Sequence, residues 1–191
     1  KFKINMKELI NILTRTSFSK LKIPYPSNEQ MDLIYKAALR APDHKWLRPS
    51  RFIQITGSGL DKLSEIFYNY GKNNIDGISE EKLNKYKSLP YRSPMIVVLV
   101  SNITDHPSVP EHEQMFTTAA AAQNILLALH ALNFGGIWRT GIFAMNIDIE
   151  KSLGLSSNQK ILGYLYIGTP DGKSKKIPNL DIKEFVTKID K

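Results

Sequence analysis

The feature that most constrains the fold is a long apolar stretch in the second half of the chain. Residues 111–134 predict the longest helix, and its centre reads TTAAAAQNILLALHAL, which is apolar on nearly all sides. A helix with this pattern has to be buried on several sides, by the core of its own chain or by a partner subunit. Gly135 follows at the place where a left-handed C-cap is expected.

Shorter patterns on both sides of this helix predict an α+β fold. Apolar residues at helical spacing predict further helices at residues 6–13, 27–41, 60–70 and 146–153. Apolar and β-branched runs predict strands at residues 51–56, 95–100 and 161–167. Because helices outnumber strands and do not strictly alternate with them, we expect a small, mostly antiparallel sheet covered by helices. The spacing of Ser27 and Gln30 predicts a capping box at the start of the second helix.

One segment, residues 71–90, lacks a clear apolar period and is rich in lysine. We predict a mobile surface insertion or a loose helix there, in a position to act as a lid. Neither repeats nor a second domain are evident elsewhere. The 191 residues are therefore expected to form one domain, 1–191, of a size that suits a single core.

Composition excludes several classes of function. The chain has no cysteine, so disulfides, thiolate nucleophiles and cysteine metal sites are excluded. No apolar stretch approaches the ~18 residues of a membrane-spanning helix, and the N-terminal segment reads as an amphipathic helix; a cytoplasmic location is expected. The formal net charge of +8 is spread along the chain and would attract anions of any kind, including phosphorylated cofactors and nucleic acid.

Several familiar motifs are incomplete. The stretch ITGSGLDKL follows a strand, but Lys62 stands where a dinucleotide-binding loop needs its third glycine. His112 has Phe116 four residues later, where a zinc-binding helix needs a second histidine, so no metal site is predicted. There is no Gly-x-Ser-x-Gly elbow, which leaves hydrolysis without support. An aromatic and basic nucleic-acid motif is also missing, and nucleic-acid binding is not expected.

Three polar patches remain as candidate binding residues. The first is Arg15-Thr16-Ser17, where a guanidinium and two hydroxyls suit a phosphate, or simply form a solvated helix end. The second is the connection RAPDHKWLRPSRF, residues 40–52, which is either a binding site or a polar loop in which Trp46 serves as a packing anchor.

The third patch is FGGIWRTG, residues 134–141. Its two glycines would let a flat ligand approach the backbone, and the ring, charge and hydroxyl of residues 138–140 would contact that ligand. The alternative is a core strand followed by a tight turn. Together the three patches suit a flat, polar, phosphorylated ligand.

At these residues the chain resembles the nitroreductase family of flavoproteins, in particular its small bacterial YdjA-like branch. The matching pieces occur in order: Arg-x-Ser at 15–17, LRAPDHK at 39–45, GGIWRTG at 135–141 and GYLYIGTP at 163–170. The resemblance covers about residues 10–186. It implies a three-layer α+β sandwich that forms an obligate homodimer, with FMN at the subunit interface and in contact with both chains.

The resemblance also implies an activity. The chain is expected to be an FMN-dependent oxidoreductase that takes a hydride from NADH or NADPH through flavin N5 and passes it to a small-molecule acceptor. Nitroaromatic, quinone-like and other electron-poor rings are the expected acceptors. A flavin-binding protein without turnover, a sensor or store, is the alternative. Because the flavin would carry the chemistry and the protein would position it, no catalytic acid or base is predicted.

Site residues carry over by their match to the family motifs. Arg15, Thr16 and Ser17 would hold the phosphate and ribityl chain. Arg40 and His44 would contact the flavin of the other subunit, with Pro42 and Asp43 shaping that wall. The residues expected along the flavin ring are Gly136, Ile137, Trp138, Arg139 and Thr140, and the nicotinamide is expected near residues 130–133.

The chain also departs from the family pattern. Thr16 replaces a second arginine, and Arg48-Pro49-Ser50 replaces Gln-Pro-Trp. These departures leave the acceptor and the choice of reductant open.

Overall fold

The computed structural model describes residues 7–190, and Met6 of the predicted first helix lies outside this range. The helices are α1 (Lys7–Thr14), α2 (Asn28–Ala38), α3 (Ser58–Asn74), α4 (Glu80–Ser88), α5 (Glu111–Ala131) and α6 (Ile147–Ser152). The strands are β1 (Leu21–Lys22), β2 (Ser50–Thr56), β3 (Met95–Asn102), β4 (Gly135–Arg139) and β5 (Gln159–Pro170). Short 3-10 turns η1 (His44–Trp46), η2 (Leu89–Arg92), η3 (Gly141–Phe143) and η4 (Ile182–Glu184) complete the order.

The sheet is built around β3 and β5. β3 pairs with β2 on one side and with β5 on the other, while β5 also pairs with β4 and β1, and all of these pairs are antiparallel. The predicted antiparallel sheet is confirmed. The two-residue β1 has no signal of its own and was not predicted.

Alternating residues of β3 face two separate cores. Met95, Val97 and Leu99 pack in one apolar cluster with residues of α2 and α5. Ile96, Val98 and Val100 pack in a second cluster with α3, Tyr86 of α4 and α6. Because successive side chains of a strand point to opposite faces, the continuous apolar run of β3 indicates burial on both sides.

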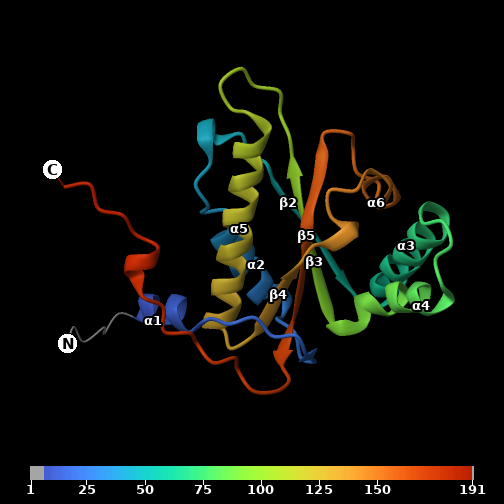
Figure 1. The fold of residues 1–191 in the computed structure, drawn as a ribbon, viewed down its shortest axis with the longest axis horizontal. Helices are drawn as coiled ribbons and strands as arrows, with labels where there is room; N and C mark the ends of the chain where they lie inside the picture. The colour runs from blue at the N-terminus through green and yellow to red at the C-terminus, as the bar shows by residue number, and fades with distance from the viewer. Residues whose placement is uncertain (1–6, 191) are drawn as a thin grey trace.

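Helices therefore cover both faces of the sheet (Figure 1). α2 and α5 lie on one side, and α3, α4 and α6 lie on the other. The predicted three-layer α+β sandwich is confirmed. The capping box is also present: the Ser27 hydroxyl accepts the Gln30 N–H, and the Gln30 side chain accepts the Ser27 N–H.

Of the two alternatives predicted for residues 71–90, the structure shows a helix and not an irregular insertion. α3 continues to Asn74, and α4 packs against it through the buried side chains Leu83 and Tyr86. Gly71 allows this close packing, because a Cβ there would lie 2.7 Å from the Tyr86 ring. α4 buries only these two side chains along its length, and two apolar anchors are too few to produce a visible helical period in the sequence.

The predicted C-cap at Gly135 is also wrong. The left-handed residue after α5 is Asn133, with φ 62°, and Gly135 is already the first residue of β4. The left-handed residue that ends the helix thus comes two positions earlier in the chain than expected.

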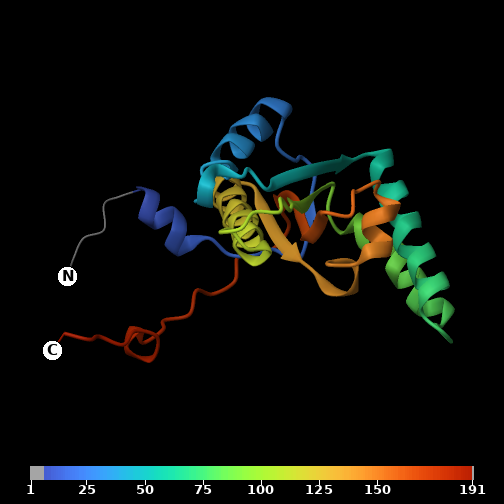
Figure 2. The same cartoon turned by 90° about the horizontal axis from the view of Figure 1, so that it is seen from above.

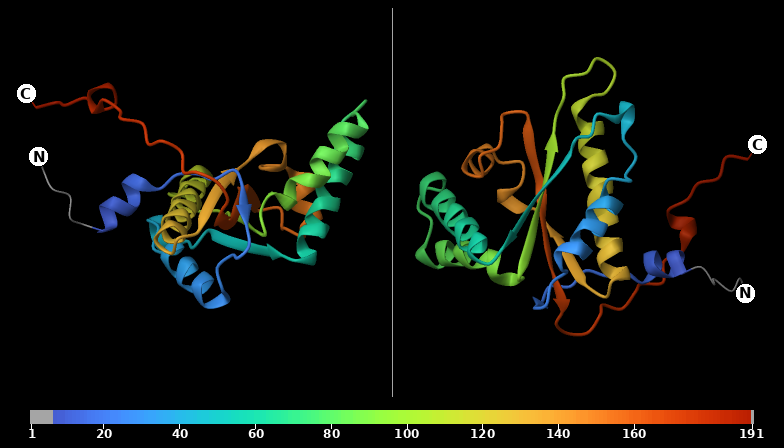
Figure 3. Two further views of the ribbon diagram at one scale, coloured as in Figure 1. Left: turned by 90° about the horizontal axis from the view of Figure 1, so that it is seen from below. Right: turned by 180° about the vertical axis from the view of Figure 1, so that it is seen from behind.

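Both ends of the described chain extend from the same side of the body (Figures 2 and 3). α1 has no buried residue, and every described residue from Asp171 to Asp190 is exposed. The apolar side chains left exposed on these arms include Leu9, Ile12, Leu13, Ile182, Phe185 and Ile189. Within residues 7–190, no helix combines the length and apolarity needed to cross a bilayer.

Candidate functional site

The first and third polar patches lie side by side. The segment after α1 runs beside β4, where the Phe18 N–H donates a hydrogen bond of 3.3 Å to the Gly136 carbonyl. α1 itself docks near the end of α5: the Asn11 amide donates to the Leu127 carbonyl, and Thr14 Oγ1 lies 3.0 Å from His130 Nε2. Residues 15–17 are thereby held next to the strand that carries Arg139.

Two buried guanidinium nitrogens in this region have no hydrogen-bond partner among residues 7–190. They are Arg15 Nη1 and Arg139 Nε. Burying a cationic donor without an acceptor costs free energy. Ligands with oxygen atoms, above all anions, would satisfy both nitrogens.

The two glycines of β4 serve packing. A Cβ on Gly135 would lie 2.9 Å from Pro170 and 3.0 Å from Phe18, and one on Gly136 would lie 2.8 Å from Leu126. The expectation that these glycines leave room for a ligand is therefore wrong at both positions, because the protein's own side chains occupy that space. The alternative, a core strand followed by a tight turn, describes this backbone, and Gly141 has φ +71° in the turn.

Trp138 is fixed by the neighbouring strand β5. Its indole N–H donates to the Leu162 carbonyl at 3.2 Å. Gly163 lies beneath it with φ +138°, and a Cβ there would collide with the indole and lie 2.7 Å from the Arg139 carbonyl oxygen. The indole is therefore held in a fixed position, and its only hydrogen-bond donor is already bonded to the protein backbone.

A cleft of about 450 Å³ opens between β4 and the α3–α4 hairpin. It is lined by Phe67, Tyr86, Leu89, Arg92, Trp138, Arg139, Thr140, Gly141, Ile142, Phe143, Tyr164 and Tyr166. A second cavity of about 460 Å³, lined in part by Lys20 and Asp171, shares Arg92 and Arg139 with this cleft. Asp171 is already engaged, because it forms an ion pair of 2.8 Å with Lys22.

The two arginines sit around a buried phenol. The Arg139 guanidinium carbon lies 5.4 Å from the centre of the Tyr166 ring. Burial raises the pKa of Tyr166 to about 12, although the positive charges of Arg139 and Arg92 act to lower it. Tyr166 thus stays protonated at neutral pH and leaves the positive charge of the arginines unneutralised.

The second polar patch lies in a loop between α2 and β2. Asp43 organises this loop, because its carboxylate accepts the Arg48 N–H at 2.9 Å and its carbonyl accepts the Trp46 N–H. Lys45, Trp46 and Arg48 all have positive φ, between 53° and 57°. Such conformations are uncommon for residues other than glycine and gather at functional loops.

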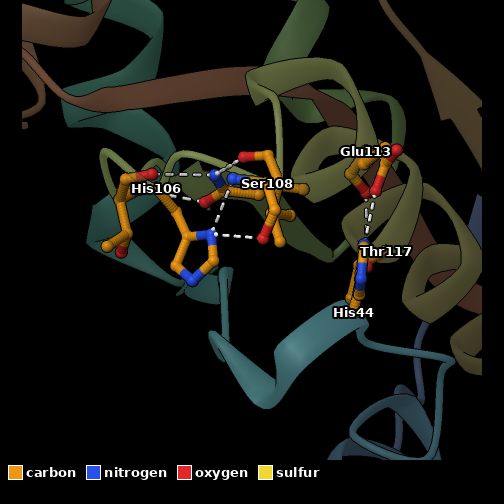
Figure 4. Close-up of polar contacts among 8 residues, drawn as sticks. His44, His106, Ser108, Glu113 and Thr117 are labelled. Carbon is orange, nitrogen blue, oxygen red and sulfur yellow. Dashed lines mark hydrogen bonds and ion pairs between the residues drawn. The ribbon is translucent and has the colours of Figure 1, made fainter.

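His44 connects this loop to α5 (Figure 4). Its Nδ1 lies 2.7 Å from Glu113 Oε2, and both side chains remain about half exposed. Pro42, Asp43 and His44 line a cavity of about 570 Å³ together with Glu113, Phe116, Thr117 and Ala120. That cavity shares no residue with the two cavities at Arg139. A single chain therefore places Pro42, Asp43 and His44 in a different cavity from Arg139 of the third patch.

Three further residues of these patches lie at the surface. Arg40 is exposed at the end of α2, as is Thr140 at the end of β4. The interpretation of Trp46 as a packing anchor is wrong for this chain, because its side chain is 76% exposed and lies under the Arg48 guanidinium.

Sequence reasoning missed Arg92 and the aromatic wall of the cleft. Arg92 ends η2, directly before the buried strand β3, and belongs to no motif. Phe67 and Tyr86 come from α3 and α4, whose pairing could not be seen in the sequence. Within residues 7–190 no group of three or more His, Asp or Glu side chains is arranged to hold a metal ion.

A family model described as "Nitroreductase family" matches residues 12–169 of this chain. The Escherichia coli K12 protein named "Putative NAD(P)H nitroreductase YdjA" is 34% identical over 183 residues, which cover 95% of this chain and 99% of that protein.

Two solved structures share the fold. One is a nitroreductase-like family protein from Bacillus cereus, with a TM-score of 0.82, 22% identity and 99% of each chain covered. The other is a Desulfovibrio desulfuricans protein described as "a putative nitroreductase in complex with fmn", with a TM-score of 0.75 and 20% identity. That match covers 97% of this chain and 98% of the other.

Proposed function

The chain belongs to the nitroreductase family, and on that premise we propose that it is an FMN-dependent NAD(P)H oxidoreductase that reduces electron-poor aromatic acceptors. Nitroaromatic and quinone-like rings are the proposed acceptors. The whole chain would act as one FMN-binding domain. Because NAD(P)H is a reductant held inside cells, the proposed reaction belongs in the cytoplasm.

One observation carries this proposal: the unpartnered, buried nitrogens of Arg15 and Arg139. The backbone contact between Phe18 and Gly136 holds their two segments together, and Thr16 and Ser17 place hydroxyl groups in the same segment. A phosphate would satisfy guanidinium donors through short, charge-assisted hydrogen bonds. Residues 15–17 thus fit the phosphate end of FMN, and the Arg139 nitrogen offers a donor to the flavin beside β4.

The separate position of the second patch supports a site shared between two subunits. In a symmetric dimer the same surface of each chain faces the other, so a loop on one chain can complete a site on its partner. We assign Arg40, Pro42, Asp43 and His44 to the FMN that the partner subunit mainly holds. Phe116, which is 65% exposed beside His44, and the apolar arms are the surfaces such a dimer would cover.

FMN held by these residues would supply hydride transfer between the nicotinamide and the acceptor, which is chemistry that the protein's own side chains lack. For a nitro group the proposed overall reaction is nitroarene + NAD(P)H + H⁺ → nitrosoarene + NAD(P)⁺ + H₂O. The chain's own part would be to bind the phosphate and ribityl chain through Arg15, Thr16 and Ser17, and to hold the ring beside residues 136–140, with Arg139 as a donor to the flavin. His44, held by Glu113, forms part of the facing wall. No side chain is assigned as acid or base.

Purification tests this proposal. The protein should be yellow with FMN-like absorbance, and anaerobic addition of NADH or NADPH should bleach it, with the colour restored by a nitroarene or quinone. A colourless protein that takes up no added FMN would contradict it. A flavin that binds but stays oxidised would favour a sensor or store over an enzyme.

A further inference from the structure

Arg92 occupies the point where the two cavities meet. It ends η2, is exposed, and lines both the aromatic cleft and the neighbouring polar cavity. Among the described residues, neither Arg92 nor Arg139 forms an ion pair. A guanidinium offers a rigid fork of donors that matches a carboxylate, sulfonate or phosphate.

The cleft around Arg92 combines aromatic residues and two arginines with no acidic residue. Its base is formed by the buried rings of Phe67, Tyr86, Phe143 and Tyr164, and the half-buried indole of Trp138 forms one wall. Its volume of about 450 Å³ falls within the range of small-molecule sites. Aromatic walls favour a planar ring, and two arginines without an acidic partner favour a negative charge on that ring.

Arg139 and Arg92 are not equivalent in this cleft. Arg139 is half-buried, rests over the Tyr166 ring and carries one of the orphaned nitrogens assigned above to FMN. Arg92 comes from a different element, is exposed at the mouth and has no buried unpartnered nitrogen. The arginine that remains for the acceptor is therefore Arg92.

We propose that the cleft selects electron-poor aromatic acceptors that carry an anionic group, and that Arg92 is the residue that recognises this group. This inference rests on the proposed function and names the substrate class of the same site. The reduction step is the one balanced above, and the anionic group takes no part in it.

The experiment compares 4-nitrobenzoate with its neutral analogue 4-nitrobenzamide as acceptors for the FMN-loaded protein. The wild type should prefer the anion in kcat/KM, and high salt should weaken this preference because the arginine is exposed. Arg92→Gln should lower the ratio of the two kcat/KM values about ten-fold, as expected for one charged hydrogen bond. Arg92→Lys, which keeps the charge but loses the fork, should lower it less.

Lys85→Gln is the matched control. Lys85 is also an exposed cation of the hairpin, but it does not line the cleft. This variant loses the same charge and should keep the wild-type ratio. A fall in the ratio as large as that of Arg92→Gln would mean that only the general field matters, and would overturn the proposal.

A binding measurement separates this inference from the proposed function. By calorimetry, 2-naphthoate should bind the wild-type protein more tightly than 2-naphthamide, and Arg92→Gln should remove the difference. Neither compound is reduced, so this result does not depend on turnover. Equal affinities for the two compounds would overturn the inference even if the enzyme is active, and so would an Arg92→Gln defect confined to FMN or NADPH affinity.

Discussion

The molecule has two regions that resemble its family, and they differ in how far their polar groups are satisfied. In the β4 region, which comprises residues 15–18 and β4, two guanidinium nitrogens are buried without partners. In the loop region, residues 40–48, Asp43 and His44 already have partners and the side chains of residues 44–46 are exposed.

This difference suggests what each region lacks. Burying a donor without an acceptor costs free energy that a ligand could recover, and this cost is the reason for proposing the β4 region as an anion site. The loop region needs no ligand for its own hydrogen bonds, but it holds three residues in unfavourable backbone conformations at the surface. This exposed, strained loop is the region that we propose contacts the partner subunit's FMN.

The largest expected effect tests the rigidity of the β4 region. In Gly163→Ala the new methyl group would meet the Trp138 indole and the Arg139 carbonyl oxygen in a backbone conformation that alanine rarely adopts. Strain and overpacking should together lower the free energy of unfolding by about 2–5 kcal/mol. Denaturant unfolding measures this, with Gly172→Ala as control, since Gly172 has a similar φ of +127° but open space around it.

A loss below about 1 kcal/mol in Gly163→Ala would show that β4 can shift easily. The β4 region would then not be rigid, and the proposed difference between it and the loop region would be contradicted. The FMN affinity of the variant gives a second measurement, because a displaced Arg139 should bind the flavin more weakly.

The next effect separates ligand binding from stability within the β4 region. Arg15→Met keeps much of the side-chain volume and removes the orphaned cation. FMN affinity should fall by about 1.5–3 kcal/mol, the value of a charged hydrogen bond. The flavin-free protein should be no less stable than the wild type, because no protein partner of the buried Nη1 is lost.

Arg51→Met is the control for this prediction. Its guanidinium donates to the carbonyls of Arg48 and Ser50 and is mostly exposed, so its loss should leave FMN affinity unchanged. If Arg15→Met leaves FMN affinity unchanged as well, Arg15 does not belong to the site.

Sequence predicted those parts of the fold that rest on local patterns. The β-branched run of β3, the all-round apolar α5 and the capping box at Ser27 each carry their own signal, and each is present. The family motifs brought residues 15–17 and 136–140 together as candidates, and the structure places these segments side by side. Their contact with a cofactor stays a prediction.

Sequence could not predict features that depend on packing between distant segments. α4 is held by two buried side chains against α3, and the β4 glycines are required by Leu126, Phe18 and Pro170. Arg92 reaches the cleft only because the α3–α4 hairpin places η2 beside β4. These contacts join different elements of the fold, so no periodic pattern within one element predicts them.

The smallest effect tests the loop region. His44→Ala removes one side chain from the wall proposed to face the partner's flavin, and FMN affinity should fall by about 1 kcal/mol. Stability should change little, because the exposed ion pair with Glu113 contributes at most about 1 kcal/mol. Glu113→Gln, which loosens His44 without removing it, should reduce FMN affinity less than His44→Ala does.

A mixed dimer shows whether the loop acts across the interface. When one subunit carries Arg15→Met and the other His44→Ala, a shared site collects both changes in one cavity and leaves the other cavity intact. Differently tagged subunits allow this heterodimer to be isolated and titrated with FMN. One FMN should then bind with wild-type affinity and the second much more weakly. If each chain instead forms its whole site alone, both sites carry one change and no wild-type affinity remains, which would contradict the division of the site between the two regions.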